Sequence, residues 1–322
     1  QSRRLAEMLA ATRNFRIAAH AASRREAEEW IARGRVRAAL VVPPDYARRL
    51  RRGETATAQL LIDAADPLAS QSAIAAALAL GQHASVESLA RAARGAAAGA
   101  ALGPVPRPAA VEIRVRPLYN PGLRSAVYIV PGIIGVLLSL TMMMVTAVAI
   151  VRERERGTLE QLIVTPATRS ELMLGKVAPY ILIGYLQTTA VLLLARLIFD
   201  VPVRGDLALF YAVSLAFILA NLGLGLLIST VATNQRQAMM IGYFFILPNI
   251  LLSGFMFPRE AMPDPARWLG LLFPLTYFLD VLRGIILRGV GLDALWRQTL
   301  ILTAFATLLL TVSVARFRKK LD

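Results

Sequence analysis

The apolar runs in the second half of the chain constrain its fold most. From Ser125 onward, runs of roughly twenty residues carry almost no ionisable side chains, and a helix needs about that length to cross a lipid bilayer. Hydrophobic residues make up 56% of the chain and charged residues 18%, a balance too apolar for an ordinary soluble domain. The spans are predicted at about 125–151, 171–199, 206–232, 237–257 and 298–316. We expect a polytopic α-helical membrane domain over residues 125–322.

The stretch 258–290, between the fourth and fifth predicted spans, is apolar in places but repeatedly interrupted. Its interruptions are Pro258, Pro263, Pro265, Pro274, Asp280 and Arg283. Proline breaks helices, and charged side chains are costly inside lipid. The pattern therefore predicts re-entrant external helices over 258–290, which dip into the membrane interface and return.

Residues 1–124 have the pattern of an α/β domain. Ser23 followed by Glu26 forms a capping box that predicts the start of a helix. The other elements are predicted as strands at 38–42, 58–63 and 111–115, a short helix at 46–52 and a long alanine-rich helix at 70–98. Each strand is short and apolar or alternating, and is bounded by proline, glycine or aspartate. The sequence thus predicts two domains, 1–124 and 125–322.

Basic residues predict the orientation in the membrane. They concentrate in 152–176 and in the C-terminal tail, and positively charged loops stay in the cytoplasm. Five crossings from an external domain also end inside. We therefore expect a multi-pass protein of the cell inner membrane, with domain 1–124 extracytoplasmic and the C-terminus cytoplasmic. The net charge of +15 does not predict nucleic-acid binding, because aromatic residues are not interleaved with the arginines.

Few residues could support covalent or metal chemistry. The chain has no cysteine and only two histidines, far apart, so no metal site is expected. No Ser/His/Asp set for nucleophilic catalysis can be assembled. The pair Gly175 and Lys176 does not belong to a phosphate-binding G-x-x-x-x-G-K-[ST] loop, because Val177 follows it. The sequence therefore predicts that the chain is not an ATPase and binds no cofactor of its own.

The segment that follows the first predicted span is unusual. Arg152 to Arg156 alternate in charge, and Gly157 is a natural helix break. Thr158 and Gln161 form a capping box, and Pro166 ends the short helix predicted at 158–165. A helix this short is unstable alone, so it is expected to pack against another part of the chain or a partner.

Several segments resemble the type-2 ABC exporter permeases, in the drug-efflux branch with a large external domain. The segments are RERERGTLEQLIVTP followed by RSELMLGK (152–176), IDAADPLAS (62–70), YNPGLRSAVYIVPG (119–132), NLGLGLLIST (221–230), LSGFMFPREAMP (252–263) and PLTYFLDVLRGIILRGVGL (274–292). Each is weak alone, but their joint occurrence in order is specific. The resemblance implies that 158–165 is a coupling helix that contacts a separate ABC ATPase, and that a sixth span precedes Gln1.

This resemblance also implies function and partners. It suggests a permease subunit that exports a small hydrophobic or amphipathic, drug-like substrate by alternating access. The expected partners are an ABC ATPase subunit carrying ATP and Mg²⁺, a second permease copy or close homologue, a periplasmic adaptor and the lipid bilayer, with no nucleic acid. A rival hypothesis is a membrane-anchored extracytoplasmic sensor or scaffold. An ion channel is disfavoured, because no span has the repeated polar residues of a pore.

Two sets of residues follow as candidate sites. The ATPase-coupling residues are Glu153, Glu155, Gly157, Thr158, Leu159, Glu160, Gln161, Leu162, Gln235 and Arg236. The substrate-path residues are Met142, Met143, Asn221 and Asn249. For the second set ordinary roles stay open, because asparagine also forms hydrogen bonds between membrane helices and methionine fills cores.

Overall fold

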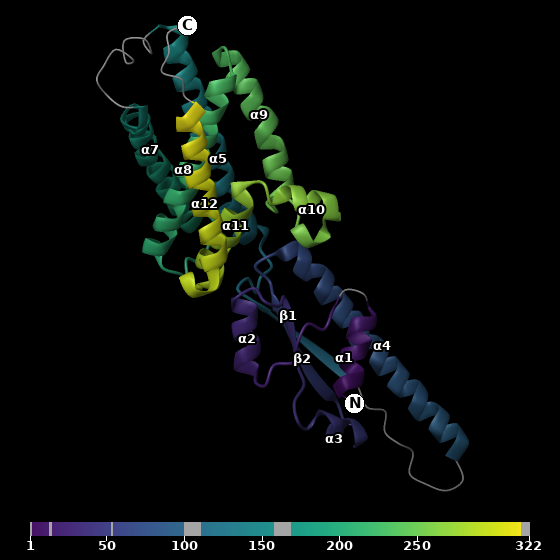
Figure 1. Cartoon of the computed structure of the whole chain (residues 1–322). Coiled ribbons are helices and arrows are strands. Elements are labelled where there is room, and N and C mark those ends of the chain that lie inside the picture. The colour runs from purple at the N-terminus through teal and green to yellow at the C-terminus, as the bar shows by residue number, and fades with distance from the viewer. Residues whose placement is uncertain (1, 13–14, 53, 100–110, 158–168, 317–322) are drawn as a thin grey trace. The chain divides into compact units, whose positions relative to one another are not determined.

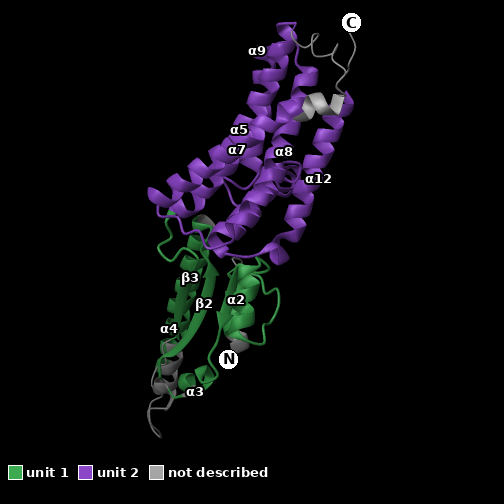
Figure 2. Ribbon diagram, turned by 90° about the vertical axis from the view of Figure 1, so that its left-hand side faces the viewer, with its two compact units in different colours: residues 1–124 green, residues 125–322 purple. Residues whose placement is uncertain are grey.

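The computed structural model describes residues 2–12, 15–52, 54–99, 111–157 and 169–316. The chain divides into two compact units, Gln1–Arg124 and Ser125–Asp322, which are coloured separately in Figure 2. Each unit is described by itself.

The described residues of unit 1 form a three-stranded sheet and four helices. In chain order the elements are α1 (Ser2–Ala11), α2 (Arg24–Ala32), β1 (Ala38–Val41), α3 (Tyr46–Arg51), β2 (Ala56–Asp63), α4 (Pro67–Gly99) and β3 (Val111–Leu118). The central strand β2 pairs antiparallel with β1 and parallel with β3. Parallel neighbours need a long crossover, which lies between β2 and β3 and contains α4.

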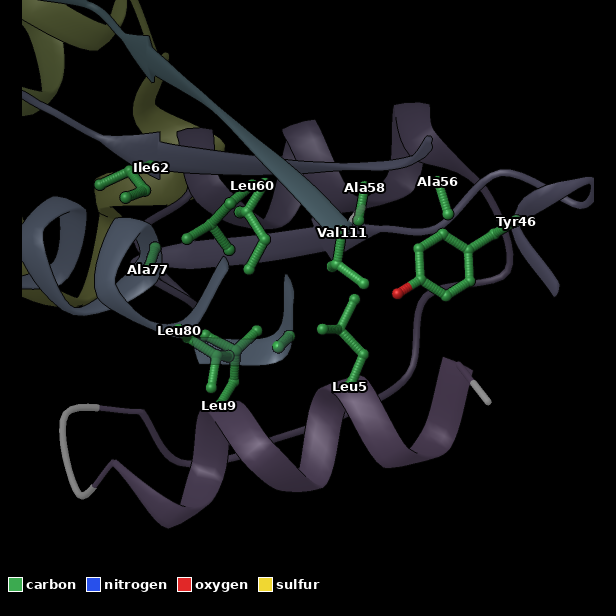
Figure 3. Close-up of a cluster of buried hydrophobic side chains, with 12 residues drawn as sticks. Leu5, Leu9, Tyr46, Ala56, Ala58, Leu60, Ile62, Ala77, Leu80 and Val111 are labelled. Carbon is green, nitrogen blue, oxygen red and sulfur yellow. The ribbon is translucent and has the colours of Figure 1, made fainter. Parts of the chain in front are cut away.

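A hydrophobic cluster on one face of the sheet forms a large part of the core of unit 1. Leu60 and Ile62 of β2 point to the same face of the sheet, where Leu5 and Leu9 of α1 join them (Figure 3). The helix α1 was not predicted from the sequence. The predicted cap at Ser23 is confirmed, because its hydroxyl accepts a hydrogen bond of 3.1 Å from the Glu26 N–H.

Unit 2 is a helical bundle (Figure 1). Its elements are α5 (Ser125–Glu155), α7 (Arg169–Leu197), α8 (Leu207–Val231), α9 (Gln235–Leu252), η1 (Arg259–Ala261), α10 (Asp264–Gly270), α11 (Pro274–Arg283), η2 (Gly284–Arg288) and α12 (Leu292–Arg316). Helix α8 packs against α5, α7 and α12. Phe217 of α8 stacks on Phe278 of α11 with ring centroids 4.0 Å apart, and both side chains are fully buried.

Within the described residues, four helices are long and apolar enough to cross a membrane: α5, residues 175–197 of α7, α8 and α12. The number becomes five if α10 and the helix 274–288, bent by 86° relative to each other, count as one span. This bent pair lies in the stretch predicted as re-entrant, and a re-entrant course stays a prediction.

Helix α9 differs from the span predicted at 237–257. It has 18 residues, ends at Leu252 and is not among the membrane-length apolar helices. The physical reason is its first turn, which contains Gln235, Arg236 and Gln237 and therefore lowers its overall hydropathy. The turn Ser253–Phe257, which the prediction included, is not helical.

Glycines allow close helix contact at the centre of the bundle. A Cβ atom on Gly225 of α8 would lie 2.5 Å from the carbonyl oxygen of Met143 on α5. On Gly223 it would lie 3.0 Å from Cβ of Leu309 on α12. The Ser313 hydroxyl of α12 also donates a hydrogen bond of 2.9 Å to the Gly223 carbonyl. Helices α5, α8 and α12 are therefore held backbone to backbone, the arrangement that small residues permit in membranes.

Candidate coupling site and transport path

The charged end of α5 is attached to the turn between α8 and α9. We call residues Arg152–Gly157 the elbow and residues 232–237 the α8–α9 turn. Gly157 has a left-handed φ of +70°, which glycine adopts without strain and which ends α5 as the sequence predicted. Arg152 Nε donates a hydrogen bond of 3.1 Å to Gln235 Oε1, and Arg154 Nη2 donates to the Ala232 carbonyl.

The strongest connection joins Glu155 to Gln235. The Gln235 backbone N–H donates to Glu155 Oε1 at 2.8 Å, and the Gln235 side-chain amide donates to Glu155 Oε2. Gln235 is the first residue of α9, so its N–H has no partner inside that helix. The carboxylate also lies at the end of α9 where the helix dipole is positive. Glu155 therefore stabilises the start of a helix 80 residues away in the sequence.

The α8–α9 turn has its own local cap. Asn234 Oδ1 accepts a hydrogen bond of 2.8 Å from the Gln237 N–H, and Gln237 Oε1 accepts one of 2.8 Å from the Thr233 N–H. Asn234 therefore caps α9, and Gln237 accepts from the residue before the cap, close to the arrangement of a capping box. The first turn of α9 is thus fixed both locally and by the elbow.

A second connection joins the elbow to α7. Lys176 Nζ forms an ion pair and hydrogen bond with Glu153 Oε2. The Lys176 side chain is 17% exposed and that of Glu153 35%, so the pair is partly shielded from water. Glu153 and Lys176 lie on the two sides of segment 158–168, which joins α5 to α7 in sequence. The ion pair therefore joins the end of α5 to the first part of α7.

The predicted coupling residues fall into three groups. Glu153 and Glu155 are bonded within the bundle, and Glu155 and Gln235 are brought together. Gly157 and Arg236 are exposed beside them. Thr158, Leu159, Glu160, Gln161 and Leu162 lie outside the described residues, as does the predicted helix 158–165.

Beneath the elbow, α5, α8 and α9 share a hydrophobic cluster. Its buried members are Met143, Ala147, Val151, Leu224, Ile228, Ala232, Ala238 and Ile246. Val151 is one residue before the charged elbow, and Ala232 receives the hydrogen bond from Arg154. The polar contacts and the apolar cluster are therefore continuous, and a movement of the elbow would also be transmitted to α8 and α9.

The predicted substrate-path residues are all buried but do not share one environment. Met142 of α5 faces α7, since a Cβ on Gly184 would meet its sulfur at 3.2 Å, whereas Met143 belongs to the cluster beneath the elbow. The Asn221 amide donates a hydrogen bond of 2.8 Å to the Phe217 carbonyl of its own helix. Asn249 Oδ1 is buried without a hydrogen-bond partner among the described residues.

Sequence reasoning missed Lys176, Arg152 and Arg154 as members of this site. The alternating charges of 152–156 were the available signal, because the intervening arginines needed partners as much as the glutamates did. The partners of the arginines could not be read from the sequence. The partner of Arg154 lies 78 residues away, and that of Arg152 lies 83 residues away. Lys176 is 23 residues from Glu153.

Helices of membrane length, packed around α8 and attached to one another at a charged elbow, define a polytopic helical membrane protein. The family model described as ABC-2 family transporter protein matches residues 1–315. The chain belongs to this family of ABC transporter permeases.

Similar proteins include two from Escherichia coli K12. The probable multidrug ABC transporter permease YbhR is 32% identical over 278 residues, 86% of this chain and 72% of YbhR. The probable multidrug ABC transporter permease YbhS is 30% identical over 291 residues, 90% of this chain and 74% of YbhS. ABC transporter G family member 20 of Dictyostelium discoideum is 25% identical over 203 residues, 62% of this chain and 28% of that protein.

Proposed function

We propose that this chain is the membrane-spanning permease subunit of an ATP-driven exporter, and that a separate ABC ATPase docks on segment 158–165 and the elbow. Two copies, or one copy with a close homologue, would line the path. ATP and Mg²⁺ would be held by the ATPase subunit. The observation that carries the proposal is the pair of hydrogen bonds from Gln235 to Glu155, which ties α9 to the helix that leads into segment 158–165.

The proposed mechanism follows from how the elbow is attached. A force on 158–165 reaches α5 directly through the chain, α9 through Glu155, and α7 through Lys176. The rigid contact between α5 and α8 at Gly225 then passes the movement to the centre of the bundle. Four helices would thus respond together, as alternating access requires.

Glu155 has a different role in this proposal from that of a plain contact residue. The resemblance to the exporter permeases implies that Glu153, Glu155 and Glu160 contact basic groups of the ATPase. Because Glu153 and Glu155 already have partners inside the bundle, we assign them to holding the elbow. Glu160, Leu159 and Leu162 remain the predicted contacts with the ATPase, and exposed Arg236 is a further one.

The proposed substrate is a small hydrophobic or amphipathic molecule. The printed names of YbhR and YbhS, probable multidrug permeases, support this class. Met143 of α5 packs in the cluster that α5 shares with α9, and Asn249 is a buried residue of α9. Asn249 has an acceptor without a partner among the described residues, which a substrate donor could use.

We further propose that unit 1 lies outside the cytoplasm, that the C-terminus lies inside, and that the inner membrane of the cell holds the bundle. The basic elbow and tail support this orientation. An external unit 1 would extend the exit route and is the natural contact for a periplasmic adaptor.

A pair of variants tests the proposal. In the reconstituted complex with the ATPase, Glu155→Lys is expected to reduce substrate-stimulated ATP hydrolysis and export together, because it reverses the charge that caps α9. Gln235→Ala should reproduce much of this loss if Glu155 acts through α9. If both variants export like the wild type, or if the chain brings down no ABC ATPase, the exporter assignment fails and the sensor or scaffold hypothesis gains support.

A further inference from the structure

The turn after α9 gathers side chains from three separate elements. The Gly254 carbonyl accepts hydrogen bonds of 3.1 Å from the Tyr128 hydroxyl of α5 and of 3.1 Å from Arg283 Nη1 of α11. Gly254 has φ +88°, and a Cβ there would lie 2.9 Å from Cγ of Arg259. We call Tyr128, Gly254, Arg259 and Arg283 the Gly254 cluster.

The Arg283 guanidinium is held in a fixed orientation with one edge unsatisfied. Its carbon Cζ lies 4.0 Å from the centroid of the Tyr128 ring, a cation–π contact, and Nη1 is bonded to Gly254. Its Nε and Nη2 are buried and have no hydrogen-bond partner among the described residues. Nε and Nη2 are neighbouring donors, and such a pair forms the fork that binds two oxygens of a carboxylate or phosphate.

Arg259 adds a second positive charge to the cluster. Its Nε is also buried without a partner in the described part of the chain, while Nη2 donates a long 3.4 Å bond to the Arg267 carbonyl. The nearby acid Asp264 is paired with Arg267 at 3.1 Å. Neither Arg259 nor Arg283 forms an ion pair with another described residue. A buried cationic donor without a partner is costly, so the cluster favours an anion.

We propose that the Gly254 cluster binds a phosphate-type oxyanion, with the Arg283 fork as its main contact and Arg259 Nε as a second donor. The chemistry fits either the phosphate of a phospholipid headgroup or free phosphate. Exposed Phe257 and Trp268 on neighbouring segments are side chains that favour the membrane interface, where headgroup phosphates lie. Since the donors are buried, the bound anion is expected to exchange slowly and to survive purification.

The test uses the purified full chain, depleted of lipid in detergent and then mixed with dioleoyl phosphatidylglycerol. Native mass spectrometry measures how much lipid stays bound. Arg283→Gln is expected to weaken binding about tenfold, because a bidentate charge-assisted contact is lost. Arg283→Lys should not restore it, since an ammonium has no fork. The matched control is Arg196→Gln, which removes an exposed charge that pairs with Asp200 at 3.3 Å and should leave binding unchanged.

A second arm identifies the source of the phosphate. Inorganic phosphate is added to the lipid-depleted chain, and the melting temperature is measured for the wild type and the variants. If lipid stays bound and inorganic phosphate does not change the melting temperature, the ligand is a lipid headgroup. If phosphate raises the melting temperature and no lipid stays bound, the ligand is free phosphate. If the wild type responds to neither probe, or if Arg196→Gln and Arg283→Gln lose binding equally, the site is overturned.

Folding of the variants is checked separately. If Arg283→Gln does not fold, Arg259→Gln takes its place, and unchanged anion binding in that variant contradicts the proposal. Both readouts need only the permease chain, without ATPase or transport. Failure of the anion-binding test therefore does not affect the exporter assignment, and failure of the exporter assignment does not affect the anion site.

Discussion

Replacing Gly225 with alanine tests whether α5 and α8 form one rigid unit. The added Cβ would lie 2.5 Å from the Met143 carbonyl oxygen and 2.8 Å from Cβ of Thr146. Ordinary contacts begin at 3.4 Å, so one backbone must move by about 0.9 Å. A carbonyl oxygen of a packed helix cannot rotate away as a side chain can. The strain therefore falls on the whole helix pair.

Two opposing terms set the size of the effect. Overpacking costs about 1–3 kcal/mol, and a backbone clash belongs at the upper end of that range. Alanine in place of glycine inside a helix stabilises the folded state by about 1 kcal/mol, because its helix propensity is higher. The expected net loss for Gly225→Ala is about 2 kcal/mol, or a fall of roughly 4–8 °C in melting temperature for a unit of this size.

The chain offers matched controls for this substitution. Gly175 of α7 has nothing within 4 Å of an added Cβ, so Gly175→Ala should leave the melting temperature unchanged or slightly raised. The melting temperature of Gly223→Ala should lie between those of the other two variants, because the nearest atom to its added Cβ would be 3.0 Å away. Thermal unfolding in one detergent, followed by tryptophan fluorescence, ranks the three variants. Equal melting temperatures for Gly225→Ala and the wild type would refute the reasoning, as would an equal fall for Gly175→Ala.

Three further outcomes are expected. Phe278→Ala should lower stability by about 3–5 kcal/mol, since the ring is fully buried against Phe217, and a smaller loss than for an exposed control such as Phe244→Ala would contradict that packing. Glu153→Lys should impair export, and adding Lys176→Glu should restore part of it through a coupling of about 1 kcal/mol; a double variant worse than both single ones speaks against the pair. Leu60→Ala should cost about 2–5 kcal/mol in unit 1 and speed its cleavage by trypsin, whereas unchanged cleavage would exclude Leu60 from the core.

The sequence predicts local features of this protein better than distant ones. The break at Gly157 and the cap at Ser23 depend only on neighbouring residues, so both could be read correctly. The bonds from Glu155 to Gln235 depend on how α5 packs beside α9, and no local pattern contains that information.

In the membrane helices, too, local features could be predicted from the sequence and distant contacts could not. The apolar runs of α5, α8 and α12 were recognisable because length and composition decide whether a helix can cross a bilayer. Helix α9 was predicted too long, since the apolar residues Phe255 to Phe257 continue past Leu252 although the chain turns at Gly254. Among the path residues, burial of Met142 and Asn221 follows from their apolar surroundings, but their separate environments do not.

The central claim is that segment 158–165 receives force from a separate ATPase, and crosslinking tests it most directly. A photo-crosslinking residue is placed at Leu162 of the tagged full chain in its own cells, and the adducts are identified by mass spectrometry. We expect an adduct with a protein that carries the G-x-x-x-x-G-K-[ST] nucleotide-binding motif. The control position is Asp293, at the start of α12, where no such adduct is expected. Adducts at Leu162 that contain no ATPase, or the same ATPase captured equally at Asp293, would contradict the account.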